Sequence, residues 1–443
     1  MEPSEGTGQA PVPLRLVVLG AYGLIGSAVT RRLLEAGHRV TGVGRSDTTA
    51  KAAHPDISWH IADIGAMSVD DWQALCADAD AVINASGALQ DGARDSLDAI
   101  HVTAPVRLAK ALAGSDTRVV QISAPGVSTE ASTAFFRSKA RGEAALRSAD
   151  LPLVILRPTL VLAPAAYGGT ALLRAGAALP GVVPNVLPDS TIACVHIDDL
   201  SQAVLDAVEG RLPAGTDVDV TGAGAESLTD LMRRTRAWLG LPKARVTLPV
   251  PAFALKLLTK AADLTGYFGW RSPLRSTALQ ALDDGVAGDP AALPNAGGKA
   301  CRDLDAIFQT LPRTVQDRWF ARSYLALPVV ILGLSLFWLA SGLIGLVQLP
   351  EATSVLTSRG IGDSTAIAAV VGGGLLDIAL GLLILIRRYA KAACLGMILL
   401  SLGYLAAGTL LTPDLWADPL GPFVKVLPAI LLAWITLGLL DDR

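Results

Sequence analysis

The chain has 443 residues, of which 51% are hydrophobic and only 17% are charged, so it is too apolar for an ordinary soluble protein. A formal net charge of -3 argues against a basic surface for nucleic acid. The apolar excess lies after residue 324, which predicts a soluble α/β part followed by a membrane part.

Two features concern compartment and metal chemistry. Residues 1–13 are small and polar, without the apolar core of a signal peptide, so we predict a disordered leader. The cysteines are far apart and show no CxxC spacing, which favours reduced core residues over disulfides or a metal site. They are Cys76, Cys194, Cys301 and Cys394.

The first predicted strand, residues 16–19, leads into three glycines spaced by three and then into a helical pattern. Gly20 permits a tight turn, Gly23 lets backbone approach a phosphate, and Gly26 lets the helix pack close to the strand. The N–H groups of such a helix N-terminus can hold a dinucleotide pyrophosphate. The spacing is G-x-x-G-x-x-G, and the intervening residues expected at the cofactor are Tyr22, Leu24 and Ile25.

The second predicted strand, residues 38–43, ends in Gly-Arg-Ser, with no acidic residue before Asp47. An acid at this place binds the ribose hydroxyls of NAD, whereas an arginine accommodates the 2′-phosphate of NADP. Arg45 therefore favours NADP(H) over NAD(H).

Further strands are predicted at residues 57–61, 81–84 and 118–122. Asp63 and Ile64 follow the first of these, where the adenine edge of the cofactor would lie. Small residues at the end of the next strand suit a cofactor that crosses the sheet edge. They are Ala85, Ser86 and Gly87.

Together these motifs resemble a short-chain dehydrogenase/reductase of the extended or atypical, epimerase-like kind, over about residues 14–310. The motifs are G-A-Y-G-L-I-G (20–26), N-A-S-G (84–87), Q-I-S-A (121–124), L-R-P-T (156–159) and V-H-I-D-D-L (195–200). The resemblance implies a Rossmann-like parallel α/β sheet with helices on both faces. It also implies a small substrate subdomain at about residues 160–300.

The resemblance further implies a catalytic set. In the family a serine polarises the substrate oxygen, and a Tyr-x-x-x-Lys pair supplies the proton and binds the ribose. Ser123 and Lys139 match, but Phe135 stands at the tyrosine position and has no proton to give. Arg157 lies in the stretch that closes over the nicotinamide end in the family, and Tyr167 is the nearest tyrosine downstream.

Two later stretches bear on the substrate side. Residues 163–190, rich in proline, glycine and alanine, are predicted to form a loop that suits an apolar or weakly polar ligand. We expect His196 to pack or to bond nearby backbone rather than to catalyse. Asp198 and Asp199 are expected to cap a helix over residues 200–208.

Four long apolar runs follow a connector at residues 311–323, and they predict a four-helix transmembrane domain over residues 324–443. The fourth run is slightly short and carries Lys425. The runs are at 324–347, 366–386, 392–411 and 423–440. This arrangement resembles the four-helix DoxX-like membrane family.

The distribution of positive charge predicts how the apolar runs are oriented in the membrane. Arginines and a lysine lie before the first run and between the second and third, while the other two joins carry mostly acids. The positive-inside rule then places both termini and the nucleotide-binding domain in the cytoplasm. We therefore predict a multi-pass inner (plasma) membrane protein.

Asp377 lies near the centre of the second apolar run, where a carboxylate is costly and is by default a functional hypothesis. It could instead form an interhelical hydrogen bond with Ser401 or Tyr404, or pair with Lys425.

These features predict a membrane-anchored NAD(P)-binding oxidoreductase or epimerase for an apolar, lipid-associated substrate, such as a quinone, isoprenoid or sterol-like carbonyl. The missing tyrosine leaves an alternative: a catalytically inactive NADPH-binding accessory or assembly protein, resembling the dehydrogenase-like accessory subunit of respiratory complex I. A third, weaker hypothesis is a solute transporter. Expected partners are the bilayer, an apolar small molecule, and another protein or a second copy, with no nucleic acid.

Overall fold

The computed structural model describes residues 12–92, 95–270, 272–419 and 421–441, so most of the predicted leader lies outside the described residues. The chain divides into two compact units. The first comprises Met1–Ala262 and Pro273–Arg318, and the second comprises Asp263–Ser272 and Trp319–Arg443. Residues 263–272 thus belong to the same unit as the apolar helices, which the sequence did not indicate.

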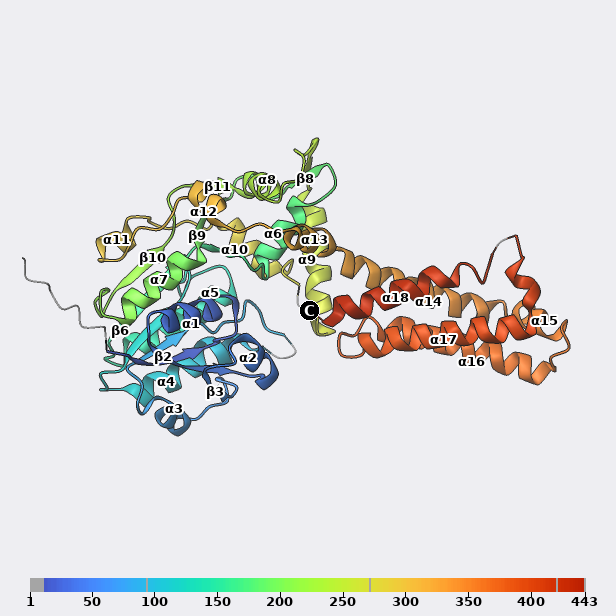
Figure 1. The fold of residues 1–443 in the computed structure, drawn as a ribbon, viewed down its shortest axis with the longest axis horizontal. Helices are drawn as coiled ribbons and strands as arrows, with labels where there is room; N and C mark the ends of the chain where they lie inside the picture. The colour runs from blue at the N-terminus through green and yellow to red at the C-terminus, as the bar shows by residue number, and fades with distance from the viewer. Residues whose placement is uncertain (1–11, 93–94, 271, 420, 442–443) are drawn as a thin grey trace, which may run out of the picture. The chain divides into compact units, whose positions relative to one another are not determined.

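The first unit is built on a seven-stranded parallel sheet with the order β10-β6-β5-β4-β1-β2-β3, which confirms the Rossmann-like prediction (Figure 1). The order reverses between β1 and β4, and ligands bind at such a switch point in open parallel sheets. The strands are β1 (Arg15–Leu19), β2 (Arg39–Gly44), β3 (Ser58–Ile61), β4 (Ala81–Asn84), β5 (Arg118–Ile122), β6 (Leu153–Pro158) and β10 (Asp217–Val220).

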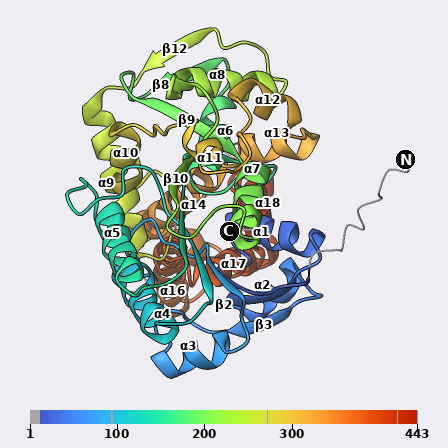
Figure 2. The ribbon, with the colours of Figure 1, turned by 90° about the vertical axis from the view of Figure 1, so that its left-hand side faces the viewer.

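Helices cover both faces of this sheet (Figure 2). Leu16 and Val18 of β1 join a buried cluster with residues of α1 (Leu24–Glu35) and α7 (Ile197–Val208). The alternate residues Val17 and Leu19 join a second cluster. That cluster draws on α3 (Val69–Cys76), α4 (Ala104–Leu112) and α5 (Ala134–Arg147). Burial on both faces explains why the strand reads as a continuous apolar run.

The rest of the first unit forms smaller sheets and short helices. Residues 163–190 are not a simple loop, because they contain α6 (Gly169–Ala177) and β8 (Val182–Asn185). A three-stranded sheet, in the order β11-β9-β7, and a two-stranded ribbon of β12 and β8 complete this part of the unit. Other elements are α2 (Asp47–Ala53), a π-helix (Ala99–Thr103), β7 (Leu160–Leu162), β9 (Thr191–His196), β11 (Ala225–Ser227), α8 (Leu228–Trp238), β12 (Val246–Pro249), α9 (Ala252–Tyr267), α10 (Ser276–Asp283), α11 (Ala292–Asn295), α12 (Leu304–Thr310) and α13 (Val315–Ser323).

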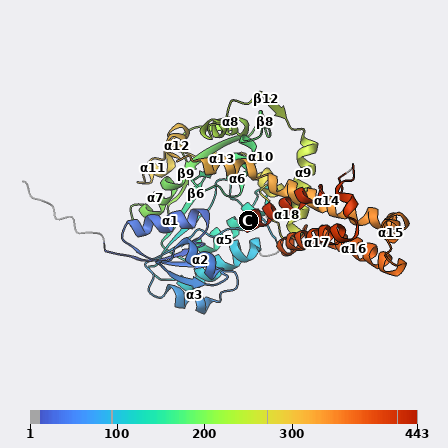
Figure 3. The same ribbon diagram turned by 45° about the vertical axis from the view of Figure 1, so that its right-hand side comes forward.

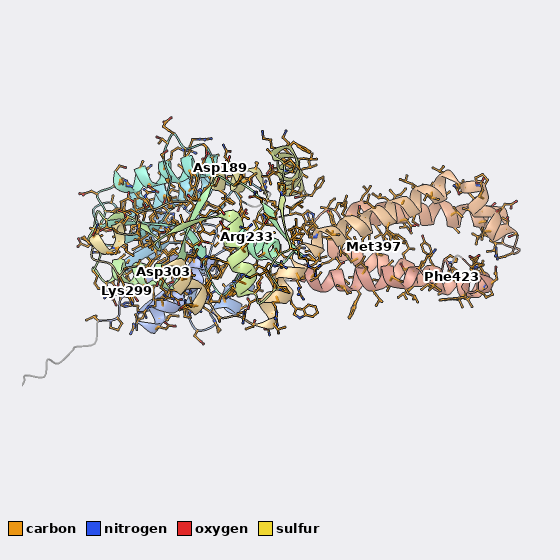
Figure 4. The ribbon with its side chains drawn as sticks, turned by 90° about the horizontal axis from the view of Figure 1, so that it is seen from above. Asp189, Arg233, Lys299, Asp303, Met397 and Phe423 are labelled. Atoms are coloured by element: carbon orange, nitrogen blue, oxygen red, sulfur yellow. The ribbon has the colours of Figure 1, made fainter. Side chains whose placement is uncertain are left out.

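The second unit is a helical bundle, and three of its helical segments are long and apolar enough to cross a membrane: Val315–Val347, Asp363–Leu383 and Ala390–Leu411 (Figure 3). The fourth predicted span is a shorter apolar helix of 16 residues. Met397 lies in the buried core of the bundle, whereas Phe423 lies before the last helix (Figure 4). The elements are α14 (Ala326–Val347), α15 (Leu349–Thr357), α16 (Asp363–Leu383), α17 (Ala390–Leu411), a 3-10 helix (Pro413–Trp416) and α18 (Val426–Asp441).

Asp377 is buried between three helices of this bundle. Ser341 of α14 donates a hydrogen bond to its Oδ2 at 2.8 Å, and Tyr404 of α17 donates to its Oδ1 at 2.9 Å. Of the partners considered from the sequence, Tyr404 is the one observed. Within the described residues, neither Ser401 nor Lys425 bonds to Asp377, so the proposed ion pair was wrong. Two hydroxyl donors therefore satisfy this carboxylate inside the bundle.

Candidate functional site

The glycine turn between β1 and α1 is shaped by close backbone contacts. Gly20 has a φ of +73°, and a Cβ there would approach the Ala85 carbonyl oxygen to 3.2 Å. A Cβ on Gly26 would lie 2.1 Å from the Gly20 carbonyl oxygen. The helix can approach the strand this closely only because Gly26 has no side chain.

The first turn of α1 offers hydrogen-bond donors. Its N-cap residue is Gly23, which has no side chain to cap the free N–H groups of the residues that follow. Such N–H groups, together with the helix dipole, form an anion site. The predicted residues Tyr22, Leu24 and Ile25 are in this same turn, so the local geometry fits a pyrophosphate.

Tyr22 and Arg45 meet at the carboxyl end of β2. The Arg45 backbone N–H donates to the Tyr22 hydroxyl at 3.0 Å, and Arg45 Nη2 forms an ion pair with Asp95 Oδ1 at 2.8 Å. The Arg45 guanidinium is 40% exposed. A cation is therefore present where the adenosine ribose would lie, and an acid already neutralises it.

The predicted adenine-edge residues follow the neighbouring strand β3. Asp63 Oδ1 accepts a hydrogen bond from the Gly65 backbone N–H at 3.0 Å, so its carboxylate holds the turn in which it lies. Ile64 is 9% exposed and belongs to the cluster under the sheet.

The loop that follows β4 is fixed by Asn84, the first residue of the N-A-S-G motif, to which the sequence analysis gave no role of its own. Asn84 Nδ2 donates to Gln121 Oε1 at 2.8 Å, while its Oδ1 accepts from the Ser86 backbone N–H at 3.2 Å. The backbone of Ala85 and Ser86 is thereby held against Gly20. The glycine turn and the loop after β4 thus lie side by side, at the switch point of the sheet.

Ser123 and Arg157 converge on a buried carboxylate that the sequence analysis did not single out either. The Ser123 hydroxyl donates a hydrogen bond to Glu143, and Arg157 Nη2 donates to Glu143 Oε2 at 2.7 Å. Arg157 Nε also donates to Asp217 Oδ1 at 2.7 Å. Arg157 is therefore held by two acids, and one of them, Glu143, also engages the Ser123 proton.

Lys139 lies in the same cluster on α5, four residues before Glu143. Its ammonium donates to the Ile122 carbonyl oxygen at 3.1 Å, and the residue is 9% exposed. Burial lowers the pKa of Lys139 to about 8, because desolvation outweighs the attraction of Glu143 and Arg157 adds repulsion. Lys139 is thus a buried cation that bonds to the carbonyl oxygen of Ile122, the residue before Ser123.

Phe135 occupies an aromatic position beside this lysine. Lys139 Nζ lies 5.6 Å from the centre of the Phe135 ring, and the ring meets His101 edge-on at 5.5 Å. His101 Nε2 accepts from the Ala88 backbone N–H at 3.2 Å, and Nδ1 lies 2.9 Å from Ser138 Oγ. Burial, with the nearby Lys139 charge, lowers the pKa of His101 to about 3, so this imidazole is neutral.

A small polar cavity lies between these groups. It measures about 10 Å³, which is room for roughly one water molecule. Its lining includes Asn84, Ser86, His101, Gln121, Lys139 and Glu143. Lys139 and Glu143, with Ser123 bonded to Glu143, therefore gather around one polar cavity (the polar network). Asn84, which also lines this cavity, holds the loop that packs against Gly20.

Two predicted residues lie outside this network. His196 is the N-cap of α7, and its Nδ1 accepts from the Asp198 backbone N–H at 3.1 Å. This confirms that His196 bonds nearby backbone, but the cap is the histidine itself rather than Asp198 or Asp199. Tyr167 is 65% exposed in the segment before α6, and nothing in the described contacts links its hydroxyl to Lys139 or Ser123.

Comparison with known families agrees with both parts of the chain. Residues 16–210 match the NAD dependent epimerase/dehydratase family, and residues 335–434 match the DoxX-like family. The first part is an epimerase-like domain of the short-chain dehydrogenase kind, and the second is a DoxX-like domain with membrane-capable helices. The family description supports a nicotinamide cofactor for the first domain.

Individual relatives are distant. "Ceramide reductase" of Caulobacter vibrioides is 21% identical over 241 residues, which cover 53% of this chain and 74% of that protein. The Bordetella bronchiseptica enzyme WbmG, solved with NAD and UDP, aligns with a TM-score of 0.50 at 17% identity over 68% of this chain and 94% of its own. The terminal R domain from the myxalamid PKS-NRPS biosynthetic pathway aligns with a TM-score of 0.52 at 18% identity. That alignment covers 71% of this chain and 91% of the R domain. The structural similarities establish the fold.

Proposed function

We propose that the protein is a membrane-anchored, NAD(P)(H)-dependent oxidoreductase that acts on the carbonyl or hydroxyl group of an apolar, lipid-associated substrate. The observation that carries this proposal is the glycine turn at the switch point, joined through Asn84 to the polar network of Ser123 and Lys139. A DoxX-like membrane domain in the same chain supports a lipid-phase substrate. The distant similarity to a protein named ceramide reductase supports the same substrate class.

The residues for the cofactor follow from the turn. Gly20, Gly23 and Gly26 would hold the pyrophosphate, Ala85 to Gly87 would pass beneath the cofactor, and Lys139 would bind the ribose hydroxyls. Asp63 and Ile64 would border the adenine, and Arg157 would support the nicotinamide end through Glu143. The nicotinamide ring supplies or accepts the hydride.

We infer a preference for NADP(H) from Arg45. An arginine beside the ribose favours the 2′-phosphate. In the structure Asp95 already pairs with Arg45, so the phosphate has to compete with this carboxylate. An Asp95→Asn variant should therefore bind NADPH more tightly than the parent.

The membrane orientation is part of the proposal. Arg387 and Arg388 stand in the join between α16 and α17, Lys391 lies in the first turn of α17, and basic residues also precede α14. By the positive-inside rule both termini and the nucleotide-binding domain face the cytoplasm.

The alternative function is a catalytically inactive NADPH-binding accessory or assembly protein. Two observations favour it: Phe135 has no proton to give, and the Ser123 proton is engaged by Glu143. In this case the cofactor would stabilise the domain or report on redox state, and the bundle would bind partners.

One experiment separates these functions. The full chain in detergent is titrated with NADPH and NADH by fluorescence, and the absorbance of NADPH is then followed with a quinone and with long-chain ketones. We expect tight NADPH binding and slow oxidation with an apolar carbonyl. Tight binding without oxidation by any of these compounds favours the accessory function, and no binding of either nucleotide contradicts both.

The affinity for NADPH is expected to fall as the pH rises through about 8, because the buried Lys139 ammonium loses its proton there. Folding stability changes in the opposite direction. The pKa of Lys139 falls from 10.5 to about 8 on folding, so between these values the unfolded chain binds more protons and the folded state gains stability with rising pH. Nucleotide titrations across this window test the prediction. Lys139→Arg is the control, since its guanidinium stays protonated and its affinity should be flat.

A further inference from the structure

Helix α9 is apolar on two opposite sides. Leu255, Thr259 and Ala262 recur at helical spacing and are buried, at 8%, 4% and 8% exposed. At 100° per residue, the opposite side of the helix carries Phe253, Leu257 and Leu264. These side chains are 75%, 69% and 58% exposed. A surface helix normally presents polar residues on its outer side, so this apolar outer face calls for a covering partner.

The segment directly after α9 contacts the residues that follow α16. Tyr267, the last residue of α9, is 85% exposed. The Phe268 carbonyl oxygen accepts from the Arg387 backbone N–H at 3.0 Å, and Trp270 Nε1 donates to the Leu385 carbonyl oxygen at 2.6 Å. The Arg387 guanidinium lies 5.6 Å from the centre of the Trp270 ring.

These contacts fix the level of this segment in the second unit. Leu385 and Arg387 directly follow α16, which ends at Leu383 and is one of the helices able to span a membrane. Aromatic residues and arginines gather at the level of the lipid headgroups. Because α9 ends one residue before Phe268, the C-terminal end of the helix lies at that level. The helix has 16 residues and is therefore roughly 24 Å long.

Two of the three charged residues of α9 are lysines, which agrees with a lipid partner; the third is Asp263. Lys256 and Lys260 are exposed and flank the apolar outer face on one side. Lysine stems can lie along acyl chains while their ammonium groups reach lipid phosphates. An apolar face bordered by lysines, on a helix joined to a membrane domain, is the pattern of a helix that lies in the membrane interface.

We propose that α9 is an interfacial membrane helix, with Phe253, Leu257 and Leu264 inserted among the acyl chains of the leaflet that contacts Arg387 and Arg388. The lysines bind anionic headgroups of that leaflet. This contact is separate from the spanning helices and does not depend on whether the protein turns over a substrate.

The test uses the full chain in nanodiscs of phosphatidylcholine and phosphatidylglycerol. Leu257→Cys and Leu264→Cys are labelled with an environment-sensitive fluorophore, and quenching by lipids that carry a spin label near the headgroup is measured. Lys110→Cys, at an exposed site on α4, is the matched control. The parent chain, in which three of the four cysteines are buried, sets the background labelling.

We expect labels at 257 and 264 to be quenched at least about threefold more than the label at 110, with blue-shifted emission. Equal quenching at all three sites would overturn the proposal. A blue shift without lipid quenching would also overturn it, since it would show a protein partner or a second copy on this face. Thermal unfolding of each labelled variant confirms that it is folded before the comparison is made.

Discussion

Replacing Gly26 with alanine is expected to abolish NADPH binding and to destabilise the first unit. The new Cβ would lie 2.1 Å from the Gly20 carbonyl oxygen, which is backbone and has no flexible end that can move aside. Gly20 already has a φ of +73° and is packed against the loop after β4, so its backbone has little room to move away from the new Cβ. Overpacking of this kind costs about 1–3 kcal/mol. Because the helix N-terminus must shift, we expect the affinity to fall by at least about 100-fold.

The matched control is Gly169→Ala at the start of α6. A Cβ there meets nothing within 4 Å, so the variant should keep both its stability and its affinity. Thermal unfolding and fluorescence titration with NADPH measure the two effects separately. If Gly26→Ala does not fold, Gly23→Ala replaces it, since its Cβ would lie 3.1 Å from the same oxygen. A folded Gly26→Ala protein with parental affinity would show that the cofactor site is elsewhere.

The sheet was predictable because its strands are buried on both faces. Such strands read as short apolar runs, and the predicted bounds of β4 and β5 agree with the structure. The glycine turn was predictable for a similar reason, because its function is local and its residues are contiguous. The membrane helices follow from length and hydropathy alone, since lipid imposes the same requirement on every span.

The polar network was only half predictable. Ser123 and Lys139 were found through motif spacing, but Glu143 was not, although it lies just four residues after Lys139. Glu143 lies on α5, and its role depends on Arg157, which bonds to it from strand β6. The roles of Asn84 and His101 were missed for the same reason, because each bonds to a side chain from a distant element: Asn84 to Gln121 of β5, and His101 to Ser138 of α5. A sequence pattern predicts which face of a helix or strand a residue occupies, but it predicts less well which side chain that residue will contact.

The membrane domain shows the same limit. Inspection of the apolar runs singled out Asp377 and several candidate partners, and one of them, Tyr404, is correct. Ser341 was not considered, because a single serine within an apolar run gives no sign of its partner. The close approach of α14 and α16 brings it there: a Cβ on Gly342 would lie 2.4 Å from the Gly374 carbonyl oxygen. The close packing of Gly342 on Gly374 therefore brings the neighbouring Ser341 hydroxyl to the carboxylate.

Replacing Phe135 with tyrosine is expected to raise the rate of carbonyl reduction by about 10²–10⁴-fold, the usual effect of a placed general acid. The position is suited to the hydroxyl. Lys139 Nζ lies 5.6 Å from the ring centre, and a nearby ammonium lowers the pKa of a phenol. The ring is held edge-on by His101, which is neutral and does not compete as a proton donor. The rate is measured by NADPH oxidation with the apolar ketone that gives the highest parental activity.

Phe136→Tyr is the matched control, because its ring lies 5.2 Å from that of Phe135 but one residue further around α5. It should bind NADPH and leave the rate unchanged. A gain with Phe135→Tyr alone would mean that the chain retains every other part of the catalytic set, so that the phenylalanine itself limits the reaction. No gain, in a variant that still binds NADPH, would contradict the proposed role of Lys139 beside this position. If the parent also bound NADPH without oxidising it, the engaged proton of Ser123 would explain its inactivity and the accessory function would be the better account.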